Sequence, residues 1–323
     1  MSRPLAVLFI GILSAISLQG CASSGYSITE PVPSQLGYEA VSTPVSGDVA
    51  IRDARGENPD YFSFGVLPAE LRIDDVAFEP IDFLRTHVAK ELDSRAAAGS
   101  VSSSGEWELD VKTLRMRNHR TNAYTPFITL TMLSGDVTTP EGVKPIGIFI
   151  TRGKVPVWTF SEVIEPIFTQ PMSLLVKELA AKINAAIYGQ SLSDSAVERL
   201  AEQIENNPVE GSTFLDVYDL GFSNNPNAIP ALSRLATHSD QYVRQAAMSS
   251  LGILRSIDHI DFLIGVQDET DSWSDRAVAI KALGDIGTPE TLDYLKRLRS
   301  RLAGVKGKEN SWHLEIIDLY VRD

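Results

Sequence analysis

The stretch Val243-Arg244-Gln245-Ala246-Ala247-Met248-Ser249-Ser250-Leu251-Gly252 decides the fold of the C-terminal half of the chain. Arg276, Ala279, Leu283 and Gly284 repeat its pattern at the same mutual spacing. Recurring Leu-Gly pairs place this stretch in a longer array with intervals of 31 and 32 residues: Leu220-Gly221, Leu251-Gly252 and Leu283-Gly284. Such a period predicts a stack of helical repeats.

A second matched pair of apolar residues follows each Leu-Gly pair: Ile229 and Leu232, Ile260 and Leu263, Leu292 and Leu295. Between the two pairs, Asn225-Pro226 and Thr288-Pro289 place a capping side chain before a proline at the first helical position. Each unit is therefore expected to be a helical hairpin. The first unit has Thr213 where the later ones have Arg244 and Arg276, which indicates either a capping unit or a decayed repeat.

These residues resemble short HEAT repeats, which occur in many bacterial proteins and in phycobilin lyases. The resemblance implies stacked helix pairs with one continuous apolar core. Because Arg244 and Arg276 occupy equivalent positions, we expect them to stabilise the repeat through neighbouring acids or carbonyls rather than to bind a ligand. After the last unit, Glu309-Asn310-Ser311 offers capping side chains for a helix through Trp312, Ile316 and Tyr320. We expect that helix to cover the open end of the array.

The region 48–189 has a different pattern. Its expected strands are 49–55, 106–117, 127–133, 146–151 and 155–164, with a hairpin turn at Arg152-Gly153-Lys154 between the last two. A helix is expected after Pro80, and another from Met172 to Gly189. This order predicts an α+β sandwich, with one sheet covered by two helices, ahead of an all-α HEAT-like repeat domain over 190–323 that opens with a connecting helix at 191–205.

The first strand ends in Asp53-Ala54-Arg55. An Asp-x-Arg strand end of this kind, followed by strands and flanking helices, resembles small bacterial envelope lipoproteins of the YajG-like kind. The resemblance implies a location in the cell envelope and a fold, but no biochemical activity. Asp53 and Arg55 either form a binding pair or support a turn.

Residues 1–20 read as a signal peptide, since Arg3 precedes an apolar run that is too short to span a bilayer. Leu18-Gln19-Gly20-Cys21 resembles a bacterial lipobox. The resemblance implies cleavage between Gly20 and Cys21 and acylation of Cys21, and two or three acyl chains anchor a protein stably. Ala22 favours the outer membrane over the inner one by the same analogy, and the Ser- and Pro-containing residues 21–47 predict an extended flexible tether.

The composition and the absence of known motifs argue against several classes of function. The chain has 29 Lys and Arg against 42 Asp and Glu, a net charge of −13, which argues against general nucleic-acid binding. No catalytic motif, phosphate loop or zinc pattern is present, so we expect no catalytic residues, no cofactor and no metal. The acids Asp268, Glu269, Asp271 and Asp275 lack the spacing of an EF-hand and suit a helix N-terminus.

Two basic clusters are candidate binding sites on this acidic background. The strand cluster is Lys112, Arg115, Arg117, His119 and Arg120, and the helix cluster is Lys296, Arg297, Arg299, Arg301, Lys306 and Lys308. Either suits an anionic lipid or an acidic partner. The alternatives are that the first protects a sheet edge and that the second complements a helix C-terminus.

We therefore expect a non-enzymatic, lipid-anchored protein on the periplasmic side of the outer membrane that binds an envelope protein through its repeats. A lipid or lipopolysaccharide transport accessory is the alternative, and it requires an apolar groove between sheet and helices. An enzyme auxiliary of the lyase type is a third interpretation, based on the HEAT resemblance alone.

Overall fold

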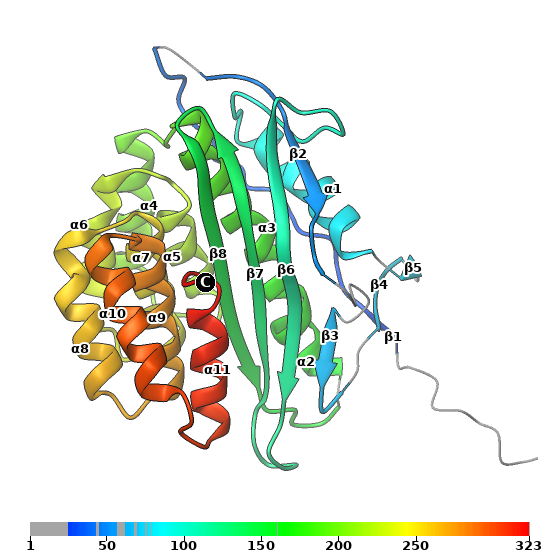
Figure 1. The fold of residues 1–323 in the computed structure, drawn as a ribbon, viewed down its shortest axis with the longest axis vertical. Helices are drawn as coiled ribbons and strands as arrows, with labels where there is room; N and C mark the ends of the chain where they lie inside the picture. The colour runs from blue at the N-terminus through cyan, green and yellow to red at the C-terminus, as the bar shows by residue number, and fades with distance from the viewer. Residues whose placement is uncertain are drawn as a thin grey trace, which may run out of the picture.

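The computed structural model describes residues 25–42, 45–56, 62–67, 70–74, 76–77, 79–159 and 161–322. Its centre is a five-stranded sheet in the order β2-β6-β7-β8, with β3 beside β2 along β6. The bounds are β2 Val49–Asp53, β3 Ser63–Gly65, β6 Trp107–His119, β7 Phe127–Thr139 and β8 Gly142–Lys154. Figure 1 shows helices α1 and α3 behind this sheet and the repeat helices beside and in front of it.

One face of the sheet is covered by α1 Pro80–Ser94 and α3 Gln170–Ile183, as an α+β sandwich requires. Helix α1 begins with Pro80 at its first position and buries Leu84, Val88 and Leu92 completely. Helix α3 is preceded by α2 Ser161–Ile164 and the π-helical turn η1 Glu165–Thr169, and a second π-helical turn, η2 Asn184–Tyr188, leads to Gly189. The predicted sandwich is confirmed.

Strand β6 keeps its apolar residues on one face through a bulge. Its register against β7 shifts between Val111 and Thr113. A bulge adds one residue and reverses the alternation of the side chains. Leu109 and Val111 before it and Leu114 and Met116 after it are therefore all buried, although their spacing breaks a strict period of two.

Two predicted features of the last strands are wrong. Residues 142–154 form one strand, whose hairpin with β7 turns at Pro140-Glu141 and not at Arg152-Gly153-Lys154. The predicted strand 155–164 is a loop followed by α2. Pro156 cannot donate to a sheet ladder, and the Glu162 carboxylate accepts the backbone N–H groups of Val157, Trp158 and Thr159 instead.

The predicted tether also differs from the structure. From Gly25 onward the chain lies on the body, where β1 Gly25–Ser27 forms a small sheet with β4 Glu70–Ile73 and β5 Val76–Ala77. Ile28 and Tyr38 are buried, and the Tyr38 hydroxyl donates to the carbonyl of Phe222. Composition indicated flexibility here, but these scattered apolar residues contact both parts of the protein.

The C-terminal region is all-helical. The connecting helix α4 Asp194–Asn206 leads into three hairpins, and the bounds are α5 Thr213–Gly221, η3 Pro226–Ala228, α6 Ile229–Leu235, α7 Gln241–Ile253, η4 Ile257–His259, α8 Ile260–Glu269, α9 Trp273–Ile286, α10 Pro289–Leu302 and α11 Lys308–Ile317. The predicted caps are present, since Asn225 accepts from Asn227 and Thr288 from Thr291. Glu309-Asn310-Ser311, however, lies inside α11, whose N-cap is Gly307.

The Leu-Gly glycines mark close contacts between successive units. A Cβ on Gly221 would lie 2.9 Å from the Cα of Ser250, and one on Gly252 would lie 2.5 Å from the Cα of Ala282. At Gly284 the neighbour is the ring of Tyr320, 2.4 Å from the added atom. Glycine lets helix backbones approach closely, which is why these positions repeat.

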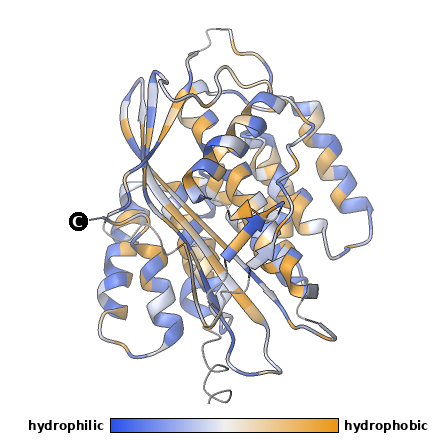
Figure 2. Ribbon diagram, turned by 90° about the vertical axis from the view of Figure 1, so that its right-hand side faces the viewer, coloured by the Kyte–Doolittle hydropathy of each residue, from blue (hydrophilic) through white to orange (hydrophobic). Residues whose placement is uncertain are grey.

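The sheet and the repeats share one apolar core. A single cluster of buried side chains runs from Ile28 through Leu130 and Leu175 to Leu251 and Ile316. In Figure 2 the helices show apolar and polar sides, with hydrophobic residues concentrated toward the interior. Among the described residues, no helix has both the length and the hydrophobicity to cross a bilayer.

Candidate functional site

The first helices of the three units, α5, α7 and α9, form an inner row against α3 and β8, while α6, α8 and α10 lie farther from the sheet (Figure 1). Two polar sites occupy this junction. One is a largely buried ionic cluster between α3 and α9, and the other is a pocket around Arg152, near the N-terminal ends of α7 and α9.

The ionic cluster consists of Glu178 and Lys182 from α3 and Lys281 and Asp285 from α9. Lys281 Nζ lies 2.8 Å from both Glu178 Oε1 and Asp285 Oδ2. Lys182 Nζ lies 2.8 Å from Glu178 Oε1 and 2.6 Å from Asp285 Oδ1. Two ammonium groups thus face two carboxylates, and the charge is balanced within the protein.

Two hydroxyl groups add hydrogen bonds to this cluster, whereas Glu178 is held by ion pairs alone. Lys281 donates to the hydroxyl of Ser249, and the Tyr320 hydroxyl donates to Asp285. Burial opposes the charge on Lys281, but the carboxylates of Asp285 and Glu178 outweigh it and raise the pKa of the ammonium above its ordinary value. Burial would likewise raise the pKa of Asp285, yet Lys182 and Lys281 hold it below its ordinary value. The ion pairs of this cluster therefore join helix α9 of the repeats to helix α3 of the sandwich.

A cavity of about 260 Å³ opens beside the ionic cluster, between β8 and the C-terminal ends of the inner helices. Its lining includes Asn224, Arg255 and Gly287, the equivalent turn residues of the three units, all with a left-handed backbone. Asp285 and Lys182 also line it, and both are bound within the cluster. Asn224 also has a partner, since its side-chain amide donates to the carbonyl of Ala181.

The second site centres on Arg152 of β8. Its guanidinium carbon lies 3.9 Å from the ring centroid of Phe214 and 3.8 Å from that of Tyr242, so two aromatic rings enclose the cation. The Tyr242 hydroxyl donates to the carbonyl of Gly153 at 2.6 Å, which holds the ring in place. Burial lowers the pKa of Arg152 below its ordinary value. The adjoining pocket has a volume of about 270 Å³.

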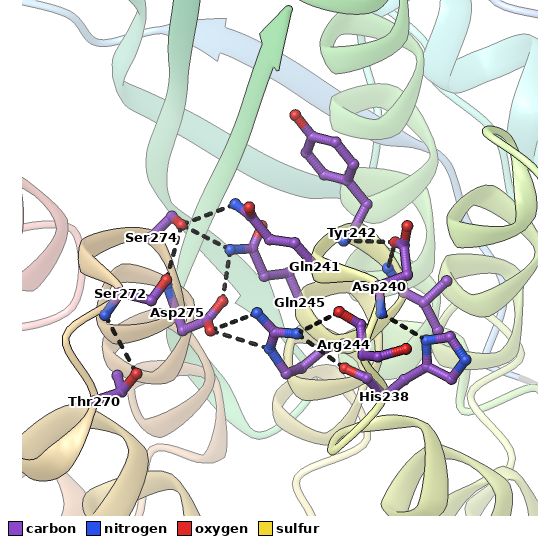
Figure 3. A network of polar contacts seen from close by, with 12 residues as sticks. His238, Asp240, Gln241, Tyr242, Arg244, Gln245, Thr270, Ser272, Ser274 and Asp275 are labelled. Atoms are coloured by element: carbon purple, nitrogen blue, oxygen red, sulfur yellow. Dashed lines mark hydrogen bonds and ion pairs between the residues drawn. The ribbon is translucent and has the colours of Figure 1, made fainter. Parts of the chain in front are cut away.

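A polar network joins the α7 and α9 ends of this pocket (Figure 3). Gln241 and Gln245 each donate a side-chain N–H to the hydroxyl of Ser274. Arg244 Nη2 lies 2.8 Å from Asp275 Oδ2, and Gln245 also donates to Asp275. Successive repeats are therefore linked by one acid from the later unit and one arginine from the earlier unit.

The corresponding arginine of the last unit has a different acid. Arg276 donates to the carbonyl of Thr270 and pairs with Glu309 of α11 at 3.3 Å.

The other residues predicted to be structural or to bind lie as follows. The inner row buries all the Leu-Gly residues: Leu220, Gly221, Leu251, Gly252, Leu283 and Gly284. Asp53 and Arg55 bind each other at the strand end, with Arg55 Nε 2.8 Å from Asp53 Oδ1, and this contact lowers the pKa of Asp53.

The strand cluster is engaged by groups of the chain itself. Arg115 and Arg117 pair with Glu315 of α11 at 3.1 and 2.7 Å. Lys112 pairs with Asp136, and Arg120 donates to the carbonyl of Thr125. His119 stacks edge-on against Trp312. The structure thus places these side chains between the sheet and α11 or at a loop.

The helix cluster is more open. Lys296, Arg299 and Arg301 pair with Asp293, Asp318 and Asp268 at the surface, at 3.3, 2.9 and 3.2 Å. Arg297, Lys306 and Lys308 are exposed and make no ion pair within the described ranges. This cluster therefore retains cations that a partner can reach.

Several sequence features carry no site here. Gly20 and Cys21 lie outside the described residues. Across the described ranges, no three His, Cys, Asp or Glu side chains are grouped to hold a metal ion. Asp268, Glu269 and Asp271 flank the turn before α9, whereas Asp275 belongs to the network with Arg244.

The comparisons with known proteins agree with the helical architecture. Residues 217–280 match the family of HEAT repeats, and residues 275–299 match the PBS lyase HEAT-like repeat. No curated protein sequence matches the chain. The molecule is thus an α+β sandwich followed by HEAT-like repeats, an architecture of helical-repeat scaffolds for protein interaction.

Sequence reasoning missed both junction sites. Glu178 and Lys281 occupy apolar helix faces, next to Leu179 and Ile280, and a charged residue in such a stripe signals a buried partner. Arg152 was expected in a turn, so nothing in the sequence linked it to Phe214 and Tyr242.

Proposed function

We propose that this protein is a lipid-anchored envelope adaptor without enzymatic activity, which binds a partner protein through the outer row of its repeats. The outer row is the set α6, α8 and α10, together with the turn η4 that leads directly into α8. The observation that carries the proposal is the burial of the inner row against α3 and β8, because it leaves the outer row as the open side of the array (Figure 1).

The outer row has the chemistry of a contact surface. Ile257, just before α8, is 61 % exposed, and Phe262, Ile264 and Val266 of α8 are only half-buried. The same helices carry exposed charges: Arg301 of α10 pairs with Asp268 of α8, and Arg297 of α10 is exposed. Protein interfaces combine apolar centres with polar rims in this way.

The packing of the sandwich favours an adaptor over a lipid carrier. Leu84, Val88, Leu130, Phe168 and Leu175 fill the space between sheet and helices and have essentially no exposed surface. The two junction cavities lie on the repeat side of the sheet. A carrier requires an apolar groove large enough for an acyl chain.

Acylation of Cys21 would set the distance between body and membrane. Gly25, the first residue of β1, follows Cys21 by four positions, and four extended residues span at most about 14 Å. An anchored protein would therefore be held close to the outer membrane by its β1 edge.

The test is site-specific photo-crosslinking in intact cells, with the probe at position 257 on the outer row. The matched control places it at Tyr124, which is 92 % exposed in the β6–β7 loop, at the opposite end of the sheet from the cavity that Arg255 lines (Figure 1). We expect an adduct with one envelope protein from position 257 only, weakened by Arg297→Glu. Equal adducts from both positions would refute the outer-row interface.

Anchoring is tested separately. Cys21→Ala should move the protein from the membrane fraction to the soluble fraction while its circular dichroism spectrum stays unchanged. Retention of the variant in the membrane would disprove acylation without affecting the crosslinking result.

A further inference from the structure

Arg152 is a buried cation whose charge the protein does not neutralise. Only 6 % of the residue is exposed. Nη2 donates to the side-chain oxygen of Gln170 at 3.0 Å, but Nε and Nη1 have no hydrogen-bond partner. Throughout the described part of the chain, no carboxylate lies within ion-pair distance of this guanidinium. A buried charge without a partner is costly, so its retention requires a reason.

The surroundings make this cost larger. Phe214 and Tyr242, which enclose the guanidinium, belong to the first turns of α5 and α7, and Ser272 to Ser274 at the start of α9 line the same pocket. Helix N-termini carry partial positive charge and attract anions. A cation in such a position lacks the negative charge that would make the arrangement favourable.

The neighbouring carboxylates are bound elsewhere. Asp240 caps α7 by accepting from the backbone N–H groups of Tyr242 and Val243. Asp275 is bound by Arg244 and Gln245. Asp240 acts on Arg152 only through space, and neither carboxylate contacts it, so within the described residues no carboxylate pairs directly with this guanidinium.

We propose that the pocket beside Arg152 binds a small oxyanion group, a carboxylate or a phosphate, which supplies the missing counter-charge. The rest of the lining carries no formal charge: Thr151, Gln241, Gln245 and Ser274 are polar members, and Pro126, Ile128 and Trp273 are apolar ones. Its volume of about 270 Å³ accommodates such a group together with part of the molecule that carries it.

Ser274 is the donor best placed to contact the anion. Its hydroxyl oxygen accepts from both Gln241 and Gln245, which leaves its own proton to donate to Ser272 or to a ligand. Nε and Nη1 of Arg152 are shielded from solvent, so the guanidinium would attract the anion through its charge and not through a direct hydrogen bond. In a low-dielectric pocket, opposite charges a few ångströms apart attract strongly without direct contact.

The proposal is tested by titrating the full-length protein with sodium phosphate and, separately, with sodium acetate, at constant ionic strength set with chloride. Binding is followed by isothermal titration and by the Nε–H resonance of Arg152 in ¹H–¹⁵N spectra. We expect saturable binding of at least one anion and a shift of that resonance, and the stronger ligand identifies phosphate or carboxylate as the natural group.

Two variants separate binding from structure. Arg152→Met keeps the stacked chain without the charge and should weaken binding on the order of tenfold to a hundredfold, as expected for a charge-assisted contact. Ser274→Ala leaves the aromatic stack intact and should weaken anion binding by a smaller factor. This variant provides the test if Arg152→Met proves unstable.

Arg117→Met is the matched control, because Arg117 also lies over an aromatic ring, at 4.7 Å from Phe64, but is paired with Glu315. It should bind the anion as the unmodified protein does. No saturable binding of either anion, or equal binding by the Arg152→Met and Ser274→Ala variants and the unmodified protein, would overturn the proposal.

Discussion

The two polar sites at the junction of sheet and repeats treat buried charge in opposite ways. In the cluster of Glu178, Lys182, Lys281 and Asp285, each ammonium lies within 2.8 Å of both carboxylates. At Arg152, two aromatic rings and one amide oxygen take the place of a carboxylate. Both sites join β8 or α3 to the inner helices, one toward the C-terminal ends of these helices and the other at their N-terminal ends.

This difference distinguishes a site that stabilises the fold from a site that can bind a ligand. A balanced cluster is complete within the protein, and breaking it leaves an uncompensated charge in the core. An unbalanced cation is incomplete, and a ligand can complete it. The following predictions test whether the two sites differ in this way.

The largest effect is expected from Lys281→Met. This change leaves two buried carboxylates with one ammonium group, and breaking a buried ion pair typically costs about 3–5 kcal/mol. Chemical denaturation should show the loss in the free energy of unfolding. Adding Asp285→Asn restores the charge balance and should recover part of the loss, whereas a single variant as stable as the unmodified protein would show that the cluster does not lock the two parts.

The same cluster predicts a stability that falls at both extremes of pH. Asp285 has a lowered pKa in the folded protein, so its contribution is present above the ordinary value of 3.8 and is lost as the pH falls through the folded value. Lys281 has a raised pKa, so its contribution is complete below the ordinary value of 10.5 and is lost as the pH rises through the folded value.

Burial also raises the pKa values of Tyr218 and Tyr320, which adds to the alkaline loss. Each unit of pKa shift corresponds to about 1.4 kcal/mol. Unfolding free energies measured across pH should show a shallower alkaline decline in Lys281→Met than in the unmodified protein. Identical slopes would contradict the assignment of Lys281.

Arg152→Met should change stability by no more than about 1 kcal/mol in chloride buffer. The lost cation–π contacts, about 0.5–2 kcal/mol each, are offset because the variant no longer buries an unpaired charge. Denaturation under the conditions used for Lys281→Met gives the direct comparison. A loss above about 3 kcal/mol would mean that the protein already satisfies this guanidinium.

The smallest effect is expected at the surface. Arg301 and Asp268 are 3.2 Å apart and largely exposed, and such pairs contribute about 0.2–1 kcal/mol at most. Arg301→Ala should therefore lower stability by less than about 1 kcal/mol, with a still smaller effect in high salt. A loss as large as that of Lys281→Met would remove the contrast between buried and exposed charge.

The parts of the fold with a strong local period could be predicted from sequence. The Leu-Gly spacing identified the three hairpins, and the helical stripes around Leu84 and Leu175 identified α1 and α3. Features set by distant contacts could not. The N-terminal residues read as a tether because the surfaces that bury Ile28 and Tyr38 come from elsewhere in the chain.

The candidate site was hidden for the same reason. Arg152 is separated from Phe214 and Tyr242 in sequence, and the β8–α5–α7 packing alone brings the three together. The basic residues Arg115 and Arg117 stood out by their charge, yet Glu315, which pairs with both, lies near the end of the chain. The sequence shows where basic residues are close together along the chain. Whether their charges are neutralised depends on acids that tertiary contacts bring to them.

Tyr320 sets the length of the repeat array. Gly221 and Gly252 each receive the inner helix of the following unit, but Gly284 receives the ring of Tyr320, which also lies against Gly147 of the sheet. An array of repeats has no inherent end, since every unit offers a surface for another. Here one aromatic side chain closes that surface and is bound to the sheet, so a further repeat inserted after Gly284 would have to detach the C-terminus from the sandwich before it could stack.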